Sequence, residues 1–380
     1  MAGVPRLSRR ARWAIPAGAL VITGAVIGGS LISVAQASPG LPSRTPAQLL
    51  VQVADSVTPP LTGTVVETTS LGLPSLPGTA NPTSIASLLT GSHTVRVWYS
   101  GPRHFRLAVP EPLSETDVIA DGNTAWQWES TANAVTEYSL PAHSSAPQTA
   151  PTTAPLTPQQ AAQQVLAAVG PTTTVSVDSN VTVAGQPAYE LVLAPKDSRS
   201  LVGQVQIAID GKNGVPLRLQ VYARGASSPA FQVGYTAIQF VTPAPADLTF
   251  TPPPGAKVSH VNLSAPSGSD QRPGDVSTIG SGWLTVLDLP GTGLTAPSGS
   301  GSGANASGDS PSGDSAAVLN ALLQSATPVS GAWGSGRLLQ TSLVSVLITD
   351  GGHTFVGAVQ PSVLYAAAGQ AAAGSQATTP

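Results

Sequence analysis

The sequence contains no cysteine among its 380 residues. This absence excludes a disulfide framework, a cysteine-ligated metal site and a lipidated cysteine behind an N-terminal leader. Charge is also scarce, because Asp, Glu, Lys and Arg make up only 9% of the chain, and aromatic residues make up 4%. With 16 basic against 19 acidic residues, the chain lacks the basic surplus that a nucleic-acid-binding protein needs. We therefore expect no nucleic acid among its partners.

Glycine and proline, by contrast, are abundant, with 39 and 36 residues. This share is high for a globular protein and still below the range of disordered chains, which predicts folded parts joined by linkers. The clearest linker is residues 291–315, of which 14 are Gly or Ser. Such a composition is typical of a flexible connection, and the segment has none of the context of a phosphate-binding loop.

The first 37 residues have the pattern of an export signal. Four arginines (Arg6, Arg9, Arg10 and Arg12) precede an uncharged apolar run of 22 residues, "WAIPAGALVITGAVIGGSLISV", and "AQA" follows as a small-residue cleavage pattern. The run is also long enough to span a bilayer, so a cleaved signal and a retained N-terminal anchor are both open. Either alternative places the rest of the chain outside the cytoplasm.

The segment after the signal begins with a helix. Thr45 followed by Pro46 is typical of a helix start, and apolar residues at Leu49, Leu50, Val53, Ala54 and Val57 predict an amphipathic helix over 46–57. A second start, Thr157 with Pro158, predicts a short helix over 158–169 with an apolar face that includes Val165 and Leu166. These are the two helices that we expect in the first domain.

Runs of strand length fill most of the remaining sequence up to residue 240. They begin with "LTGTVVETTS" (61–70), "HTVRVWYS" (93–100) and "HFRLAVP" (104–110), and nine more runs follow, among them "TAWQWES" (124–130). Apolar residues alternate along them, so we expect one apolar side made of Val97, Tyr99, Phe105, Leu107, Trp126 and Trp128 together with Val95 and Val109. About a dozen antiparallel strands predict a large sheet that curls around a space.

Four stretches of this region resemble a known family. "VWYSGP" (97–102), "VIADGNTAWQWESTANAVTEY" (118–138), "AYELVLAPKD" (188–197) and "LTFTPPPGAKV" (248–258) are similar, in order and spacing, to the outer-membrane lipoprotein carrier (LolA) family and the MucB/RseB N-terminal domain. The resemblance covers residues 45–258. It implies an incomplete antiparallel β-barrel with two helices on its concave side and an apolar cavity that holds the acyl chains of a lipid or lipoprotein.

The resemblance also suggests a role for the loop after the first strand. "TSLGLPSLPG" (69–78) contains two prolines and two glycines, which favour a loop, yet it carries Leu71, Leu73 and Leu76. In the family this segment lies near the cavity mouth, so the leucines either contact a lipid as part of a lid or plug the open end as core. One family feature is missing: Trp98 and Pro102 match the carriers' "W-x-x-R-P" strand, but Gly101 replaces its latch arginine. Arg96, Arg103 and Arg106 nearby are out of register and are interpreted as surface charges.

Catalytic and metal-binding motifs are missing from the sequence. The five histidines have no metal-ligand spacing, no G-x-S-x-G motif is present and the carboxylates are scattered. The sequence therefore predicts a protein that is not an enzyme and that has no catalytic residue, no metal and no cofactor.

The C-terminal part is expected to form a separate small α+β module. "SGWLTVLDLP" (281–290) predicts a strand, "SAAVLNALLQSATPV" (315–329) a helix capped at Ser315, "GRLLQTSLVSVLITDGGHTFVGAV" (336–359) a hairpin that turns at 350–352, and "PSVLYAAAGQAAA" (361–373) a closing helix. The expected organisation is a signal or anchor (1–37), a half-barrel (38–258), a linker (259–275) and the module (276–380), into which 291–315 is inserted.

Two classes of function remain open from the sequence. The first is an extracytoplasmic carrier or holder of lipid or lipoprotein acyl chains, which would pass them to a membrane acceptor or retain them. The second is a regulator like MucB/RseB, which binds an anti-sigma factor and also has a C-terminal domain. A wall-associated structural protein is a more distant alternative.

Overall fold

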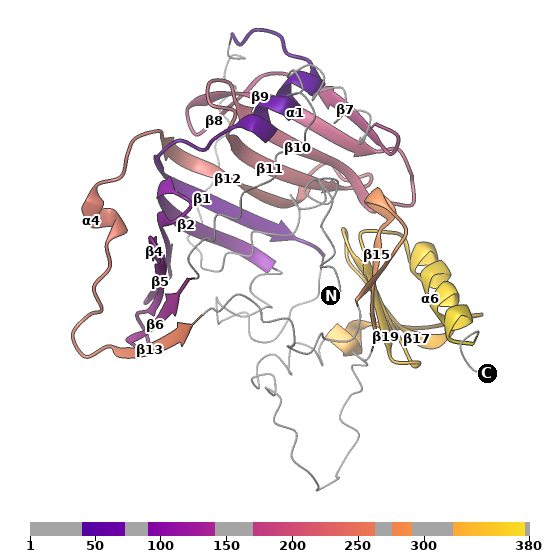
Figure 1. Ribbon diagram of the computed structural model, residues 1–380. Helices are drawn as coiled ribbons and strands as arrows, with labels where there is room; N and C mark the ends of the chain where they lie inside the picture. Colours follow the sequence, from indigo (N-terminus) through magenta and orange to yellow (C-terminus); the bar gives the residue numbers. More distant parts are fainter. Residues whose placement is uncertain (1–39, 73–89, 141–169, 263–275, 291–321, 377–380) are drawn as a thin grey trace, which may run out of the picture.

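The computed structural model describes residues 40–72, 90–140, 170–262, 276–290 and 322–376, and they form two β-sheets with few helices (Figure 1). The larger sheet has 13 strands and the smaller one has six. The prediction of a mainly β chain with a large curled sheet is confirmed, and the large sheet is not closed into a barrel.

The large sheet takes its strands from the region between residues 61 and 262. They are β1 (Leu61–Ser70), β2 (Thr90–Gly101), β3 (His104–Pro110), β4 (Glu115–Asp121), β5 (Thr124–Glu129), β6 (Ala134–Ser139), β7 (Thr173–Val177), β8 (Val181–Val183), β9 (Gln186–Pro195), β10 (Val202–Asp210), β11 (Pro216–Ala223), β12 (Pro229–Gln239) and β13 (Lys257–Asn262). Their order in space is β13-β6-β5-β4-β3-β2-β1-β12-β11-β10-β9-β7, with β8 on β9.

Nearly all neighbours in this order are antiparallel hairpins, as the alternation of the sequence predicts. Two pairings are not local. β1 pairs antiparallel with β12, which lies about 170 residues later in the chain, and joins the two halves of the sheet. β13 pairs parallel with β6, so the sheet extends to Asn262 and the expected boundary at residue 258 lies within its last strand.

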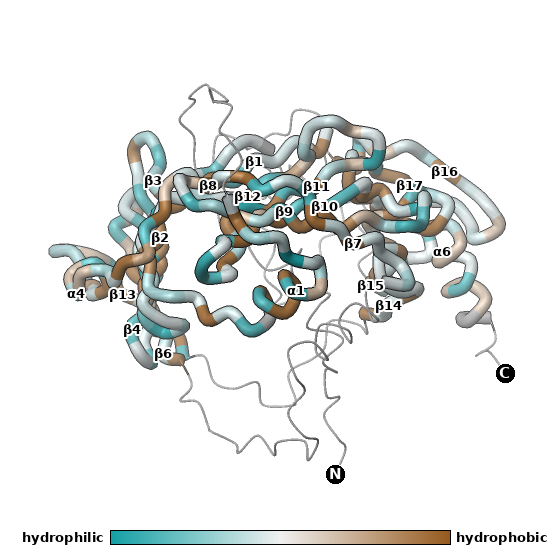
Figure 2. The backbone as a smooth tube through the Cα atoms, turned by 90° about the horizontal axis from the view of Figure 1, so that it is seen from above, coloured by the Kyte–Doolittle hydropathy of each residue, from teal (hydrophilic) through white to brown (hydrophobic). Residues whose placement is uncertain are grey.

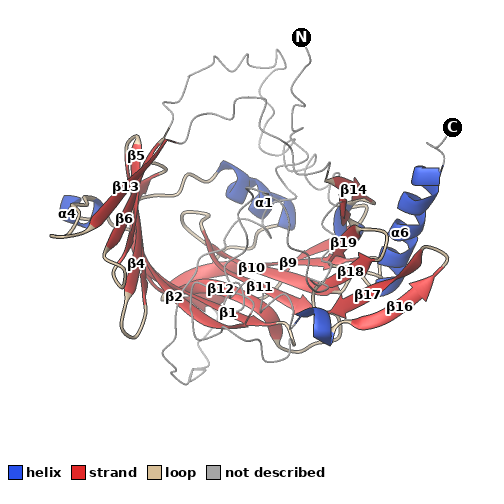
Figure 3. Cartoon of the chain, turned by 90° about the horizontal axis from the view of Figure 1, so that it is seen from below, coloured by secondary structure: helices blue, strands red, loops and turns tan. Residues whose placement is uncertain are grey.

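Helix α1 (Pro46–Asp55) lies inside the curl of the sheet, above β9 and β10 (Figure 3). Thr45 caps it as expected, since its hydroxyl accepts a hydrogen bond from the Gln48 amide (3.3 Å) and the Gln48 side chain accepts one from the Thr45 amide (2.9 Å). The helix ends two residues earlier than predicted. Val57 lies outside it and is 86% exposed, so the prediction that Val57 belongs to the apolar face was wrong.

Leu49 and Leu50 of α1 pack on Tyr189, Leu191 and Ile209 of the sheet. This contact identifies the side of the sheet that carries α1, which we call the concave face, and the opposite side is the outer face. The second expected helix, over 158–169, lies outside the described residues. Of the helices in the described ranges, none is both long and apolar enough to cross a membrane, and the apolar run at 13–34 lies outside those ranges.

A short helix, α4 (Pro245–Leu248), follows β12 and lies on the outer side of the sheet, next to β3 and β4 (Figure 1). This helix was not predicted from the sequence. The chain then passes Phe250 and returns to the sheet as β13. This connection covers part of the outer face.

The second sheet has the order β14-β15-β19-β18-β17-β16. Its elements are β14 (Ser277–Ile279), a 3₁₀ turn η2 (Gly282–Leu284), β15 (Val286–Pro290), β16 (Thr327–Gly331), β17 (Gly334–Gln340), β18 (Ser345–Thr349), β19 (His353–Gly357) and the helix α6 (Pro361–Gln376). The turn at 350–352 and the closing helix agree with the sequence prediction.

Two predictions for this module need correction. The helix expected over 315–329 does not extend to its end, because residues 327–331 form β16. The hairpin expected over 336–359 is a meander of three strands, since the chain turns a second time at 341–344, where Thr341 N donates to Val344 O (2.8 Å). Of the inserted linker, residues 291–315 lie outside the described residues.

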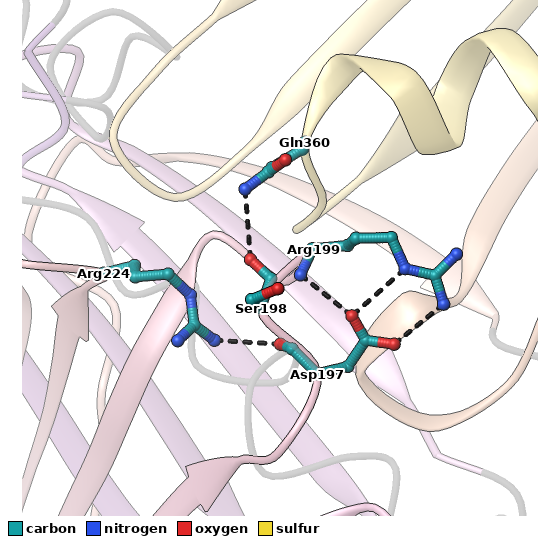
Figure 4. Close-up of polar contacts among 5 residues, drawn as sticks. All are labelled: Asp197, Ser198, Arg199, Arg224 and Gln360. Carbon is teal, nitrogen blue, oxygen red and sulfur yellow. Dashed lines mark hydrogen bonds and ion pairs between the residues drawn. The ribbon is translucent and has the colours of Figure 1, made fainter.

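The two sheets are joined through backbone hydrogen bonds. The loop after β9 runs beside the end of β19, where Leu201 N donates to Ala358 O (2.9 Å) and Gln360 N donates to Arg199 O (2.7 Å). Side chains reinforce this junction in Figure 4: the Gln360 amide donates to Ser198 O (3.1 Å), and Arg224 donates to Asp197 O (3.0 Å). The contact is therefore built into the fold on both sides.

Candidate ligand-binding face

The concave face is apolar across most of the sheet. Directly opposed residues of antiparallel strands point to the same side of the sheet, so the pairing register shows which residues of neighbouring strands share a face. Tyr99 opposes Phe105, and Val97 opposes Leu107. From α1 outward the same face continues through partly exposed apolar side chains. They are Ile207, Val205, Leu219, Val221, Val233, Phe231, Tyr235, Val65, Val97, Tyr99, Phe105, Leu107 and Val118.

The outcome for the predicted site residues is mixed. Val97, Tyr99, Phe105 and Leu107 share the concave face, where the sequence analysis put them together. In Figure 2, hydrophobic (brown) and hydrophilic (teal) residues are interspersed along the strands. Successive residues of a strand point to opposite faces, so such a pattern gives the sheet one more apolar side. Burial of the ligand candidates is partial, so this face retains apolar surface that the described residues leave accessible.

Trp126 and Trp128 do not belong to this face. Trp126 opposes Ile119, which opposes Arg106, and Arg106 opposes Trp98, so all four side chains lie on the outer face. The Trp126 ring lies 6.0 Å from the ring of Phe250, in the segment that follows α4 on the outer side. The expectation that the tryptophans share one apolar side with Val97 and Phe105 was wrong, because the strand register places Trp126 and Trp128 on the opposite side of the sheet.

Leu71 lies at the junction of the two sheets. It packs against the cluster of Val202, Ala230 and Leu343, and its carbonyl accepts a hydrogen bond from Ser342 N (3.0 Å). Leu71 is partly buried in this contact, and the choice between lid and core for the loop leucines stays a prediction. Leu73, Leu76, Val165 and Leu166 lie outside the described residues.

Sequence reasoning missed the half of the concave face that comes from β10, β11 and β12. Its members, Val205, Ile207, Leu219, Val221 and Val233, alternate with glutamines and other polar residues along their strands. That alternation was visible in the sequence, and it identified the strands. Only the pairing of β1 with β12 shows that these residues share a face with Val97 and Tyr99.

One polar spot interrupts the concave face. Glu67 opposes His93 between β1 and β2, and His93 is buried. Burial raises the pKa of Glu67, while a hydrogen bond from the Thr69 hydroxyl (2.8 Å) and the nearby His93 act in the opposite direction. Glu67 thus offers a carboxyl group with an increased tendency to be protonated inside an apolar surface.

The outer face contains a charged cluster instead. Arg106 forms an ion pair with Asp117, and the Asp117 side chain is fully buried. The Arg106 guanidinium also lies 3.7 Å from the Glu115 carboxylate and stacks over the Trp98 ring, 5.4 Å from its centroid. Burial raises the pKa of Asp117 to about 6, although Arg106 opposes this effect. Arg106 was interpreted from sequence as a surface charge, but it is a structural ion-pair partner.

Among the described residues near Gly101, no arginine takes the place of the family's latch residue on the concave face. Arg96 and Arg106 belong to the outer face by register, and Arg103 donates to Gly122 O (3.3 Å) and to the Asn123 side chain in the β4–β5 turn. Gly101 has no atom within 4 Å of the position that a Cβ would take. Space for a side chain therefore exists at the position where the carriers have arginine.

A cleft of about 370 Å³ lies beside the start of α1. Its lining is mostly polar and comes from Leu41, Ser43, Arg44, Val177, Asp178, Ser179, Asn180 and Tyr189. Within the described ranges, no three His, Cys, Asp or Glu residues gather in a way that would hold a metal ion. The concave face is the candidate site, because four of the residues predicted from the sequence, Val97, Tyr99, Phe105 and Leu107, lie on it.

Comparison with known proteins gives matches among solved structures. The MucA/MucB complex of Pseudomonas aeruginosa matches with 14% identity and a TM-score of 0.42, over 85% of this chain and 96% of that one. A LolA-superfamily protein of Nitrosomonas europaea matches with 12% identity and a TM-score of 0.21, over 55% of this chain and 99% of that one. An uncharacterised protein of Thermus thermophilus matches with 13% identity and a TM-score of 0.32, over 56% of this chain and 98% of that one.

No family model and no curated protein matches the chain. The structural neighbours include members of the LolA superfamily and MucB, the two groups that the sequence resembles. At identities of 12–14%, this likeness concerns the fold alone.

Proposed function

We propose that the chain is an exported, non-catalytic binding protein that holds the acyl chains of a lipid or lipoprotein on the concave face of its large sheet. The observation that carries the proposal is the apolar surface from Ile207 of β10 to Val118 of β4, which crosses seven strands with Glu67 as its one acidic or basic side chain in the described strands apart from His93. The N-terminal pattern of arginines and a long apolar run supports export.

The physical basis is the transfer of apolar surface out of water. Each buried methylene of an acyl chain contributes about 0.8 kcal/mol, so ten buried methylenes supply roughly 8 kcal/mol before the entropy cost of binding. A sheet is suited to this task because its backbone polar groups are already paired within the ladder. The curl lets side chains of distant strands contact one flexible ligand.

Mass spectrometry of lipid extracted from the purified exported protein tests the proposal. We expect a defined acyl species at a ratio near one per chain. In a second arm, Leu107→Asn should weaken binding of a fluorescent hexadecanoic acid by about ten-fold. Leu113→Asn is the matched control, because Leu113 is fully exposed and lies outside the concave face. Absence of both co-purified lipid and probe binding would refute the proposal.

A second candidate is a regulator that binds a protein such as an anti-sigma factor. It is favoured by the second sheet, which the carrier function does not require and which is fastened to the large sheet by the backbone bonds of residues 199–201 and 358–360. The neighbour MucB was solved in complex with MucA. Recovery of an anti-sigma factor by the immobilised exported protein, with no lipid bound, would favour this candidate over the carrier.

A further inference from the structure

The second sheet has an apolar face on each side. On one side, Val286, Leu347 and Phe355 pack under α6. The intervening residues of the same strands point the other way, and six of them are also apolar; we call this side the far face. Two rows of opposed residues make up this face across β15, β19, β18 and β17. One row is Leu287, Val356, Val346 and Leu339, and the other is Leu289, Thr354, Ile348 and Arg337.

The far face is partly accessible and almost uncharged. Leu287 is 40% exposed, and the other five side chains are only partly buried. Arg337 is the charged residue in register with this side of the described strands, opposite Ile348, and its guanidinium donates to Leu323 O (3.0 Å). A sheet with α6 on one side needs a single apolar face, so the second one requires another explanation.

The far face is turned toward the large sheet. In Figures 1 and 3, α6 lies on the side of the second sheet that is away from the large sheet, so the opposite side looks toward the space in front of the concave face. The two apolar surfaces also meet. Val344 and Ala358, next along the chain from β18 and β19, pack in one cluster with Val205, Val221 and Phe231 of the concave face.

We propose that the far face is a second wall of the ligand site, so that acyl chains are held between the two sheets. This inference rests on the proposed function and specifies its geometry. The continuity of the two surfaces at the Val344 cluster is the argument for a shared occupant. Each wall has a single acidic or arginine side chain in its described strands, Glu67 or Arg337, and this scarcity of charge selects acyl chains rather than a polar polymer.

An unpaired hydroxyl on the far face adds chemical detail. Thr354 opposes Leu289 and Ile348 in the middle of this face, is 6% exposed, and its Oγ1 has no hydrogen-bond partner among the described residues. A buried hydroxyl without a partner destabilises the free protein. A carbonyl or hydroxyl of the ligand, as at the ester or amide end of an acyl chain, would supply that partner.

The test measures binding of the fluorescent hexadecanoic acid to three variants of the full exported protein. Ile348→Asn, on the far face, should weaken binding by about ten-fold, as Leu107→Asn does on the concave face, while Leu113→Asn should bind like the wild type. If Leu107→Asn loses affinity and Ile348→Asn keeps it, the second wall is refuted and the proposed function stands. If the wild-type protein does not bind the probe, both fail.

A crosslinking experiment on the unmodified sequence avoids any effect of the variants on folding. Diazirine-labelled hexadecanoic acid should label peptides of 284–290 and 345–357 together with peptides of 93–109. Labels confined to the large sheet would overturn the inference. Thr354→Val completes the set: we expect a higher Tm, because the buried hydroxyl is removed, and a several-fold lower affinity. Unchanged affinity would overturn the role of the hydroxyl.

Discussion

The two faces of the large sheet differ in the side chains that they carry and in what packs against them. The concave face carries partly exposed apolar side chains beside the area that α1 covers, whereas the outer face packs partly buried rings and an ion pair against one another and against the α4 segment. Both faces come from the same strands, whose residues point alternately to each side. The comparison teaches that tryptophans and an ion pair mark the outer face here, whereas aliphatic residues together with Tyr99, Phe105, Phe231 and Tyr235 mark the concave one.

The largest expected effect concerns the part of the concave face that α1 closes. Leu49→Ala should lower the free energy of unfolding by about 2–5 kcal/mol, because Leu49 is fully buried against Tyr189 and Leu191 and its loss leaves a cavity. Denaturant unfolding measures this change. Leu113→Ala, at a fully exposed position, should stay within about 0.5 kcal/mol of the wild type, and equal losses in both variants would contradict the packing.

A smaller loss of stability is expected at Gly63, which lies on the concave face in close contact with Ala237 and Tyr235 of β12. A Cβ there would lie 2.8 Å from Ala237 O and 2.9 Å from the Tyr235 ring, so Gly63→Ala should destabilise the protein by about 1–3 kcal/mol. Gly101→Ala is the matched control, since nothing lies within 4 Å of its Cβ position. Thermal unfolding of the two variants decides the matter, and an unchanged Tm for Gly63→Ala would be evidence against this packing.

Leu71 tests whether the junction of the sheets is structural. Leu71→Ser should destabilise the protein by about 1–3 kcal/mol, because the side chain packs with Val202 and Leu343. Affinity for the fluorescent fatty acid per folded molecule should remain that of the wild type. The reverse result, normal melting with lost affinity, would instead assign Leu71 to the lid over the ligand.

The smallest expected effect is a pH dependence on the outer face. The pKa of Asp117 is raised from its ordinary value of 3.8 to about 6, so between these values the folded chain binds more protons at this group than the unfolded chain. For this group, the free energy of unfolding therefore rises as the pH falls from 6 toward 4. Asp117→Asn should remove this contribution while keeping the side-chain volume.

The measurement is the Tm of the wild type and Asp117→Asn at several pH values between 4 and 7. We expect the Tm of the wild type to rise relative to the Tm of Asp117→Asn as the pH is lowered from 6 to 4. A difference that stays constant with pH would show that Asp117 titrates as it does in the unfolded chain.

Local signals in the sequence were sufficient for the elements themselves. Thr45, Pro46 and Gln48 form a complete capping box through neighbours in sequence, so the start of α1 needs no tertiary contact. The alternation in 93–110 and the glycines at 351–352 likewise determine strands and a turn within a few residues. The prediction for Val57 was wrong because α1 ends at Asp55, although the apolar periodicity of the sequence continues to residue 57.

The sequence by itself determined that this chain forms many antiparallel strands, and that Val97, Tyr99, Phe105 and Leu107 share one apolar face. Only the tertiary structure decided which side of each strand faces the concave space. Alternation defines two faces for every strand but does not say which one is shared with a distant strand, and Trp126 fell on the outer face because Phe250, far along the chain, covers it. The pairing of β1 with β12 and the contact of Leu71 with Leu343 are equally non-local. Their energies depend on surfaces that exist only after the strands have assembled.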